Sequence, residues 1–299
     1  MLEGTVAVEA LRGKVWLRRL ADYWALTKAK QTGLLLLTGI AGYITGVGRD
    51  ADAATLALMI VGLFLSLAGC TALNMVLDRE VDARMSRTAG RPLPQGRLRP
   101  LEAALFGGAL SAAGLLLCFR VQPAFGAVVT SGFLFDLFVY TLWLKRRTAL
   151  SILLGGVAGG MPILAGRTLA LGHVDGLGLL LAGAVLLWIP AHILTLATHY
   201  AEDYRRAGIP VWPNQYGARS SRLAVASATA LNAVFLAAAA WLAHVHLATL
   251  GLQLAAGATM LLLAVQQLFR PSERGNWRLF KAASVYMVAS SLLLTVGKL

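Results

Sequence analysis

The sequence predicts an all-α integral membrane protein, built as a bundle of about nine transmembrane helices. The first observation is composition, because 58% of the 299 residues are hydrophobic and only 14% are charged. Soluble domains carry about 25% charged residues, so lipid must be the solvent for much of this chain. The second observation is that the apolar runs are long and unbroken, unlike the short alternating segments of membrane β-barrels. Helices satisfy their own backbone hydrogen bonds, as a lipid environment requires.

Nine apolar segments are long enough to span a bilayer, with ends that are good to a few residues. They lie at 32–48, 53–77, 101–119, 123–143, 149–167, 176–197, 222–243, 247–268 and 279–297. No soluble module interrupts them, so residues 1–299 are expected to form a single membrane-embedded domain.

The basic residues predict the orientation of this bundle. Lys and Arg number 27 against 14 Asp and Glu, an excess that would suggest nucleic acid in a soluble protein. Here 23 of the 27 fall on one side if the N-terminal arm, about 1–28, is cytoplasmic, and only four fall on the other. Cytoplasmic loops are enriched in Lys and Arg, so the excess marks topology and no nucleic-acid partner is expected.

The first long inner loop begins with a polar triplet. Asn74, Asp78 and Asp82 are spaced four residues apart, so along a helix they drift by only about 40° per step and share one face. Such oxygen ligands suit Mg²⁺, which prefers a few carboxylates together with substrate phosphates. The alternative is a solvated helix end, but Asn74 lies within an apolar run, where polar groups are costly.

Basic residues follow the triplet directly. Arg87 and Arg91 belong to a loop of four Arg with Gly and Pro, and guanidinium groups suit bidentate contact with phosphate. A further basic turn, Lys145-Arg146-Arg147, follows the fourth span. It is equally well explained as a topology marker.

The second long inner loop is entered through a polar stripe. His192, His199 and Asp203 are spaced seven and four residues apart, within about 40° on one face of a continuous helix. Such a stripe usually lines a cavity, although a structural role is the commoner outcome for either histidine alone. Asp203 is expected to be a second arm of the metal site. Asp136, inside the fourth span, is open to three interpretations: helix packing, a proton site or a cavity wall.

Four stretches of the chain resemble the UbiA-type intramembrane prenyltransferase superfamily, and within it the protoheme IX farnesyltransferase (heme O synthase) branch. The resemblance runs from Tyr23 to about Tyr216. The stretches are Asp82-Ala-Arg-Met-Ser-Arg87-Thr-Ala-Gly-Arg91-Pro-Leu, Tyr140-Thr-Leu-Trp-Leu-Lys-Arg-Arg-Thr148, Gly155-Gly-Val-Ala-Gly-Gly-Met-Pro162 and Asp203-Tyr-Arg-Arg-Ala-Gly-Ile-Pro210. The last stretch is the most specific to the heme branch, whereas Asp136 departs from the pattern.

The resemblance implies a UbiA-like fold and transfer of a farnesyl group from farnesyl diphosphate to a vinyl group of heme B, with water added. It further implies a multi-pass protein of the plasma (inner) membrane of a prokaryote, with heme A synthase or a terminal oxidase left open as partners. The implied Mg²⁺ ligands are Asn74, Asp78, Asp82 and Asp203, and the catalytic residues are Asp78, Asp82, Lys145 and Asp203. The implied substrate-binding residues are Arg87, Arg91, Tyr140, Lys145, Arg146, His192, His199, Tyr204 and Arg205.

Two other functions remain open from the sequence. One is a prenyltransferase of the same fold that uses an aromatic acid, a quinone precursor or a lipid glycerol as acceptor. The other is a transporter or channel, in which Asp136 and the histidine stripe would line the pathway. A transporter rarely needs a cytoplasmic loop that combines three aligned metal-type ligands with four Arg, so the enzyme is favoured.

Overall fold

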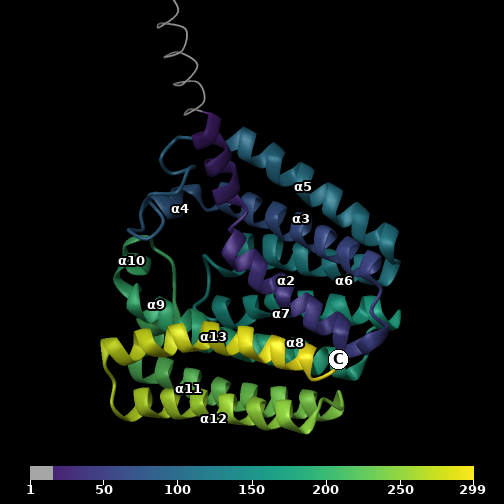
Figure 1. The fold of residues 1–299 in the computed structure, drawn as a ribbon. Helices are drawn as coiled ribbons and strands as arrows, with labels where there is room; N and C mark the ends of the chain where they lie inside the picture. Colours follow the sequence, from purple (N-terminus) through teal and green to yellow (C-terminus); the bar gives the residue numbers. More distant parts are fainter. Residues whose placement is uncertain (1–15) are drawn as a thin grey trace, which may run out of the picture.

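The computed structural model describes residues 16–299. The first 15 residues, which include the beginning of the expected N-terminal arm, lie outside the described part. The described residues form helices and turns without a β-strand. Residues 16–26 are helical and precede the first long helix (Figure 1).

Within residues 16–299, nine long helical rods confirm the predicted number of about nine spans. Eight of them are long and apolar enough to cross a membrane, and the ninth is the 19-residue α2, whose first turn contains Lys30 and Gln31. The rods are α2 (Ala29–Val47), α3 (Ala53–Leu77), α5 (Pro100–Val121), α6 (Pro123–Leu134) with η2 (Phe135–Leu144), α7 (Ser151–Leu171), α8 (Gly176–Ile189) with η3 (Pro190–Leu194) and α9 (Thr195–His199), α11 (Trp212–Leu242), α12 (Leu247–Phe269) and α13 (Glu273–Val296). Three short elements connect them: η1 (Gly48–Asp50), α4 (Arg79–Ala83) and α10 (Ala201–Arg206).

Some boundaries differ from the prediction for identifiable reasons. The expected span at 222–243 is the apolar part of α11, which begins ten residues earlier at Trp212. The added portion is joined across a kink at Gly217, whose φ of 79° is readily adopted only by glycine. Two spans also contain π-helical segments, η2 and η3. In η2 the amide of Lys145 donates to the carbonyl of Tyr140, five residues earlier, at 2.9 Å.

Small residues bring neighbouring helices into close contact. The α3–α5 pair meets through Gly69 on one side and Gly107 and Ser111 on the other, and a Cβ on Gly69 would lie 2.6 Å from the carbonyl oxygen of Gly107. Close backbone approach at small residues is a common way for helices to associate in lipid. The helix α2 packs against α3, α7 and α13, so it connects the two halves of the chain.

The two long inner loops lie at the same end of the bundle, as the distribution of basic residues predicts. The short helices α4, α9 and α10 lie near one another at this end, away from the C-terminus (Figure 1). At the other end Arg167 forms two hydrogen bonds, of 2.8 and 2.7 Å, to the carboxylate of Asp175. The same guanidinium donates to the carbonyl of Thr45, which ties α7 to α2.

Candidate active site

The Asn74-Asp78-Asp82 triplet lies where α3 ends and α4 begins. The amide of Asp78 donates to the carbonyl of Asn74 at 2.9 Å, and that of Asp82 donates to the carbonyl of Asp78 at 2.8 Å. These i→i+4 bonds continue helical spacing through the junction, so the three side chains stay on one side. All three residues are buried.

Asp78 forms an ion pair with Lys145 and keeps one oxygen free. Lys145 Nζ lies 2.5 Å from Asp78 Oδ2, while Asp78 Oδ1 is buried without a hydrogen-bond partner. Burial alone would lower the pKa of Lys145, but Tyr140 and Asp78 outweigh it and raise that pKa. A buried carboxylate oxygen without a donor is the kind of group that a cation would complete.

The other members of the triplet also have partners from elsewhere in the chain. Arg91 Nη1 lies 2.6 Å from Asp82 Oδ2. Asn74 Nδ2 donates to Asp136 Oδ2 at 2.5 Å, and Thr141 Oγ1 donates to Asn74 Oδ1 at 3.0 Å. Asp136, which had no partner in the sequence pattern, therefore fixes the orientation of the Asn74 amide.

Asp203 connects the second inner loop to the first. Its Oδ2 accepts hydrogen bonds from the backbone amide of Ser86, at 3.0 Å, and from the Ser86 hydroxyl. Its Oδ1 accepts from Arg206 at 3.0 Å. The Ser86 hydrogen bond is the main cause of a lowered pKa of Asp203. Nearby, the Arg87 guanidinium lies 5.8 Å from the centre of the Tyr200 ring, a cation–π contact between the same two loops.

These contacts leave the four expected Mg²⁺ ligands paired with protein groups. Within residues 16–299, no group of three or more His, Cys, Asp or Glu is close enough to hold a metal ion. The donor set still fits Mg²⁺, because carboxylate and amide oxygens are its protein ligands and Asp78 Oδ1 is free and buried. The residues that would hold the ion are therefore Asn74, Asp78 and Asp82, and the part of Asp203, whose Oδ2 is bonded to Ser86, stays a prediction.

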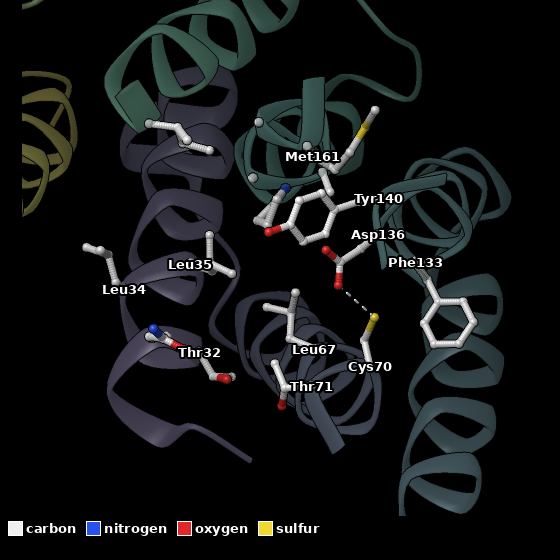
Figure 2. A pocket seen from close by; sticks show the side chains of 18 of the residues that line it. Thr32, Leu34, Leu35, Leu67, Cys70, Thr71, Phe133, Asp136, Tyr140 and Met161 are labelled. Atoms are coloured by element: carbon white, nitrogen blue, oxygen red, sulfur yellow. Dashed lines mark hydrogen bonds between the residues drawn. The ribbon is translucent and has the colours of Figure 1, made fainter. Parts of the chain in front are cut away.

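A cavity of about 320 Å³ begins beside the triplet and extends into the bundle. Its volume is in the range of small-molecule sites. The polar part of its wall includes Asn74, Cys70, Asp136 and Tyr140, and Figure 2 shows the Asp136 carboxylate directed between Cys70 and Tyr140. Most of the remaining wall is apolar; it includes Leu34, Leu35, Leu63, Leu67, Phe133, Ile152, Met161, Ile189 and Ile193.

Tyr140 occupies the middle of this wall because the facing helix has no side chain there. A Cβ on Gly155 would lie 2.8 Å from the Cε2 atom of the Tyr140 ring. Because Gly155 has no side chain, the Tyr140 ring packs directly against the backbone of α7. Lys28, from the turn before α2, also lines this cavity. Desolvation, together with the positive charges of Arg91 and Lys145, lowers the pKa of Lys28 to about 8.

His192 lines the same cavity and belongs to an aromatic stack. Its ring is sandwiched between Trp188 and Phe280, with centroid distances of 4.8 and 4.6 Å and interplanar angles of 13°. Its Nδ1 lies 3.2 Å from Ser284 Oγ. Both faces of the imidazole are therefore covered, and the cavity is reached through the ring edge. Phe280 and Ser284 come from α13, a span that the sequence motifs did not reach.

The polar stripe of His192, His199 and Asp203 does not lie on one continuous helix face. His199 also contacts α13, because its ring lies 4.9 Å from that of Trp277 and its Nδ1 lies 3.5 Å from Glu273 Oε1. It does not line the cavity. The helix turns at Tyr200, which separates α9 from α10, and Asp203 beyond this turn faces Ser86. The expectation that all three residues line one continuous helix is wrong, because η3 and the turn at Tyr200 interrupt the helical spacing.

The remaining expected substrate-binding residues take different positions. Arg146 donates to the carbonyl of Leu77 at 2.8 Å and so caps α3 directly before Asp78. Tyr204 packs against the core cluster that contains Val81 and Met85. Arg205 is exposed and paired with Glu202 at 2.6 Å. Arg205 does not line the cavity, and its role in substrate binding stays a prediction.

Comparison with known proteins agrees with this geometry. Residues 35–290 match the UbiA prenyltransferase family. The chain is 42% identical to a protoheme IX farnesyltransferase of Thermofilum pendens, over 92% of this chain and 98% of that protein. It is 41% identical to a protoheme IX farnesyltransferase of Archaeoglobus fulgidus, over 91% of this chain and 96% of that protein.

Solved structures share the fold at lower sequence identity. A digeranylgeranylglyceryl phosphate synthase superposes with a TM-score of 0.77 at 21% identity, over 94% of this chain and 99% of the other. A UbiA homologue from Archaeoglobus fulgidus bound to GPP and Mg²⁺ superposes with a TM-score of 0.72 at 16% identity, over 92% and 99%. The shared fold, the family match and the relatives that align over almost the whole chain all indicate the same family. The chain is a membrane-embedded enzyme that belongs to the UbiA prenyltransferase family.

Proposed function

We propose that this enzyme transfers a farnesyl group from farnesyl diphosphate to a vinyl group of heme B, giving heme O. The observation that carries the proposal is the cavity, which joins the polar triplet to the Trp188–His192 stack. Its apolar wall suits an isoprenoid tail, and its two ends offer separate places for a diphosphate and for an aromatic acceptor. The names of the relatives with over 40% identity support the same donor and acceptor.

The reaction requires an allylic C–O bond to break, with the electron pair leaving on the diphosphate. The vinyl carbon of the acceptor then forms a bond to the farnesyl carbon, and water adds to the resulting cation with loss of a proton. Mg²⁺, when bound at Asn74, Asp78 and Asp82, neutralises charge on the leaving diphosphate. Arg87, Arg91 and Lys145 add fixed positive charge around it, and Arg146 positions the α3 end.

The same proposal includes the setting of the enzyme. Residues 1–299 act as one domain in the plasma membrane of a prokaryote, with the N-terminus and both long inner loops in the cytoplasm. Heme B is a substrate rather than a resident cofactor. Heme A synthase or a terminal oxidase is the class of partner to seek by co-purification, because each would accept a modified heme.

Product analysis tests the reaction directly. Purified protein in lipid, given heme B, farnesyl diphosphate and Mg²⁺, is expected to yield heme O by mass spectrometry. A parallel reaction with an aromatic acid, a quinone precursor or a lipid glycerol should yield no prenylated product. Prenylation of one of these acceptors, with heme B unchanged, would refute the heme assignment while leaving the prenyltransferase class intact.

His192 is proposed to form part of the acceptor end of the cavity. Only its ring edge reaches the cavity, so His192→Ala is expected to weaken heme B binding and to change the Soret band if that edge ligates iron. His199→Ala is the matched control, since His199 does not line the cavity. An unchanged Soret band and unchanged heme affinity in His192→Ala would leave His192 with a packing role alone.

A further inference from the structure

Lys28 has a backbone conformation that a lysine rarely adopts. It lies between the helix at 16–26 and α2, with φ of 46° and ψ of 49° in the left-handed region. In residues 16–299, only Lys28 and His244 combine a positive φ with a side chain beyond glycine. Such strain persists where the surrounding structure enforces it, and it is concentrated at functional sites.

The surrounding turn is built to hold this conformation. Thr27 Oγ1 donates to the carbonyl of Trp24 at 2.7 Å, and Thr32 Oγ1 donates to the carbonyl of Thr27 at 2.7 Å. Thr71 of α3 donates to the carbonyl of Leu26 at 3.0 Å. Leu26, Thr27 and Thr32 are all buried. The turn is therefore fixed on both sides of Lys28 and attached to the helix that ends in the metal motif.

This fixed turn places the Lys28 side chain at the polar end of the cavity. Lys28 lines the same cavity as Asn74, Asp136 and Tyr140, the region that Figure 2 shows around Asp136. Its ammonium is influenced by four charged groups of the site, namely Arg91, Lys145, Asp136 and Asp78. It therefore belongs to the site, although its sequence position suggested only a topology marker.

Within the described residues, no protein group pairs directly with this ammonium. Lys28 Nζ has neither an ion pair within 4.0 Å nor a side-chain hydrogen bond there, whereas Asp78 Oδ2 is paired with Lys145 and Asp136 Oδ2 accepts from Asn74 and Cys70. Lys28 is partly buried, and removing a cation from water without a direct partner is costly. A strained backbone and an unpaired cation that lines the cavity at the same position indicate that an anionic ligand completes the site.

We propose that Lys28 is a substrate-binding residue whose ammonium contacts the diphosphate of the prenyl donor at the polar end of the cavity. The inference rests on the donor half of the proposed function and is independent of the acceptor. The diphosphate is the anion that fits, because the apolar wall beside Lys28 accommodates the tail to which it is attached. The triplet and Arg91 then approach the diphosphate from the loop side, and Lys28 approaches it from the side of α2.

Binding measured without acceptor tests this proposal. The probes are inorganic diphosphate and farnesyl thiodiphosphate, with farnesol as the uncharged tail, in the presence of Mg²⁺. Lys28→Met should weaken binding of both anions about tenfold or more, since a charge-assisted hydrogen bond is lost, and should leave farnesol binding unchanged. Lys30→Met is the matched control, because Lys30 is exposed two residues away, and it should bind like the wild type.

Lys28→Gly repeats the measurement in a variant that the left-handed backbone accommodates without strain, and Lys28→Arg should restore part of the affinity. Wild-type affinity for both anions in folded Lys28→Met or Lys28→Gly would overturn the proposal. A wild-type protein that binds farnesyl thiodiphosphate but yields no prenylated heme would refute only the proposed acceptor. A wild-type protein that binds neither anion would overturn both proposals.

Discussion

Replacing Asp78 by asparagine is expected to remove both an ion pair and the negative charge of a proposed metal ligand. The side chains of Asp78 and Lys145 are 9% and 19% exposed, and Nζ and Oδ2 lie 2.5 Å apart. At an effective dielectric constant of about 20, the attraction at this distance is about 7 kcal/mol before desolvation. Desolvation offsets much of it, and breaking one side of such a buried pair typically costs about 3–5 kcal/mol. Asp78→Asn and Lys145→Met should each destabilise the fold by roughly that amount.

A double-mutant cycle separates the pair from its neighbours. Unfolding free energies would be measured by denaturant titration in mixed micelles for the wild type, both single variants and the double variant. The double variant should be more stable than the sum of the single effects predicts, by about 2 kcal/mol or more, because it leaves no uncompensated buried charge. Effects that add to within about 0.5 kcal/mol would show that the two residues do not interact.

Activity gives an independent result from the same variants. Asp78→Asn should lose Mg²⁺-dependent turnover and bind Mn²⁺ more weakly by electron paramagnetic resonance, because the amide oxygen lacks the negative charge of the proposed carboxylate ligand. Lys145→Met should lose turnover while it retains Mn²⁺ binding. If folded Asp78→Asn keeps near wild-type turnover and metal affinity, Asp78 is not part of the site.

Three further outcomes are expected. Gly69→Ala should destabilise the fold by about 1–3 kcal/mol in thermal unfolding, because the added Cβ would clash with α5. Gly108→Ala is the control and should be neutral, because its Cβ would meet open space. Equal effects of the two substitutions would contradict the close α3–α5 contact. The contact of Asp203 with Ser86 should stabilise the two inner loops at neutral pH, and this stabilisation should be lost as pH falls below about 4, because the pKa of Asp203 is lowered in the folded protein. A rate of proteolysis within residues 198–221 that does not rise at acid pH would contradict this prediction. Cysteines at Gln95 and Asn214 should label from the cytoplasmic side, and labelling from opposite sides would refute the topology.

The sequence predicts the spans and the spacing of the candidate metal ligands because these depend on local patterns. The span at 53–77 coincides with α3, since a continuous apolar run bounded by Asp52 and Asp78 has no other stable arrangement in lipid. The Asn74-Asp78-Asp82 spacing also persists in the structure, because the hydrogen bonds of one helical path determine it.

The partners of these residues depend on tertiary packing and could not be predicted. Lys145 reaches Asp78 across 67 positions, and Asp136 reaches Asn74 across 62. Neither pairing has a signature in spacing. Phe280 and Ser284 were missed for the same reason, because α13 resembles any apolar span until it packs against His192. The positive φ of Lys28 could not be predicted either, because the usual sequence signal for a positive φ is a glycine.

The π-helical segment η2 determines how Tyr140 and the following Lys145 are oriented relative to each other. Tyr140 and Lys145 are five residues apart, which on an α-helix would point them about 140° away from each other. The i→i+5 hydrogen bond between their backbones brings the two side chains closer to the same side of the helix. Tyr140 in the cavity wall and Lys145, the partner of Asp78, therefore point in similar directions. One extra residue in the helical turn is thus enough to rotate Lys145 toward Asp78. A chain that lost one residue between them would keep its hydrophobic span and its sequence motif, yet direct this cation into the lipid or a neighbouring helix.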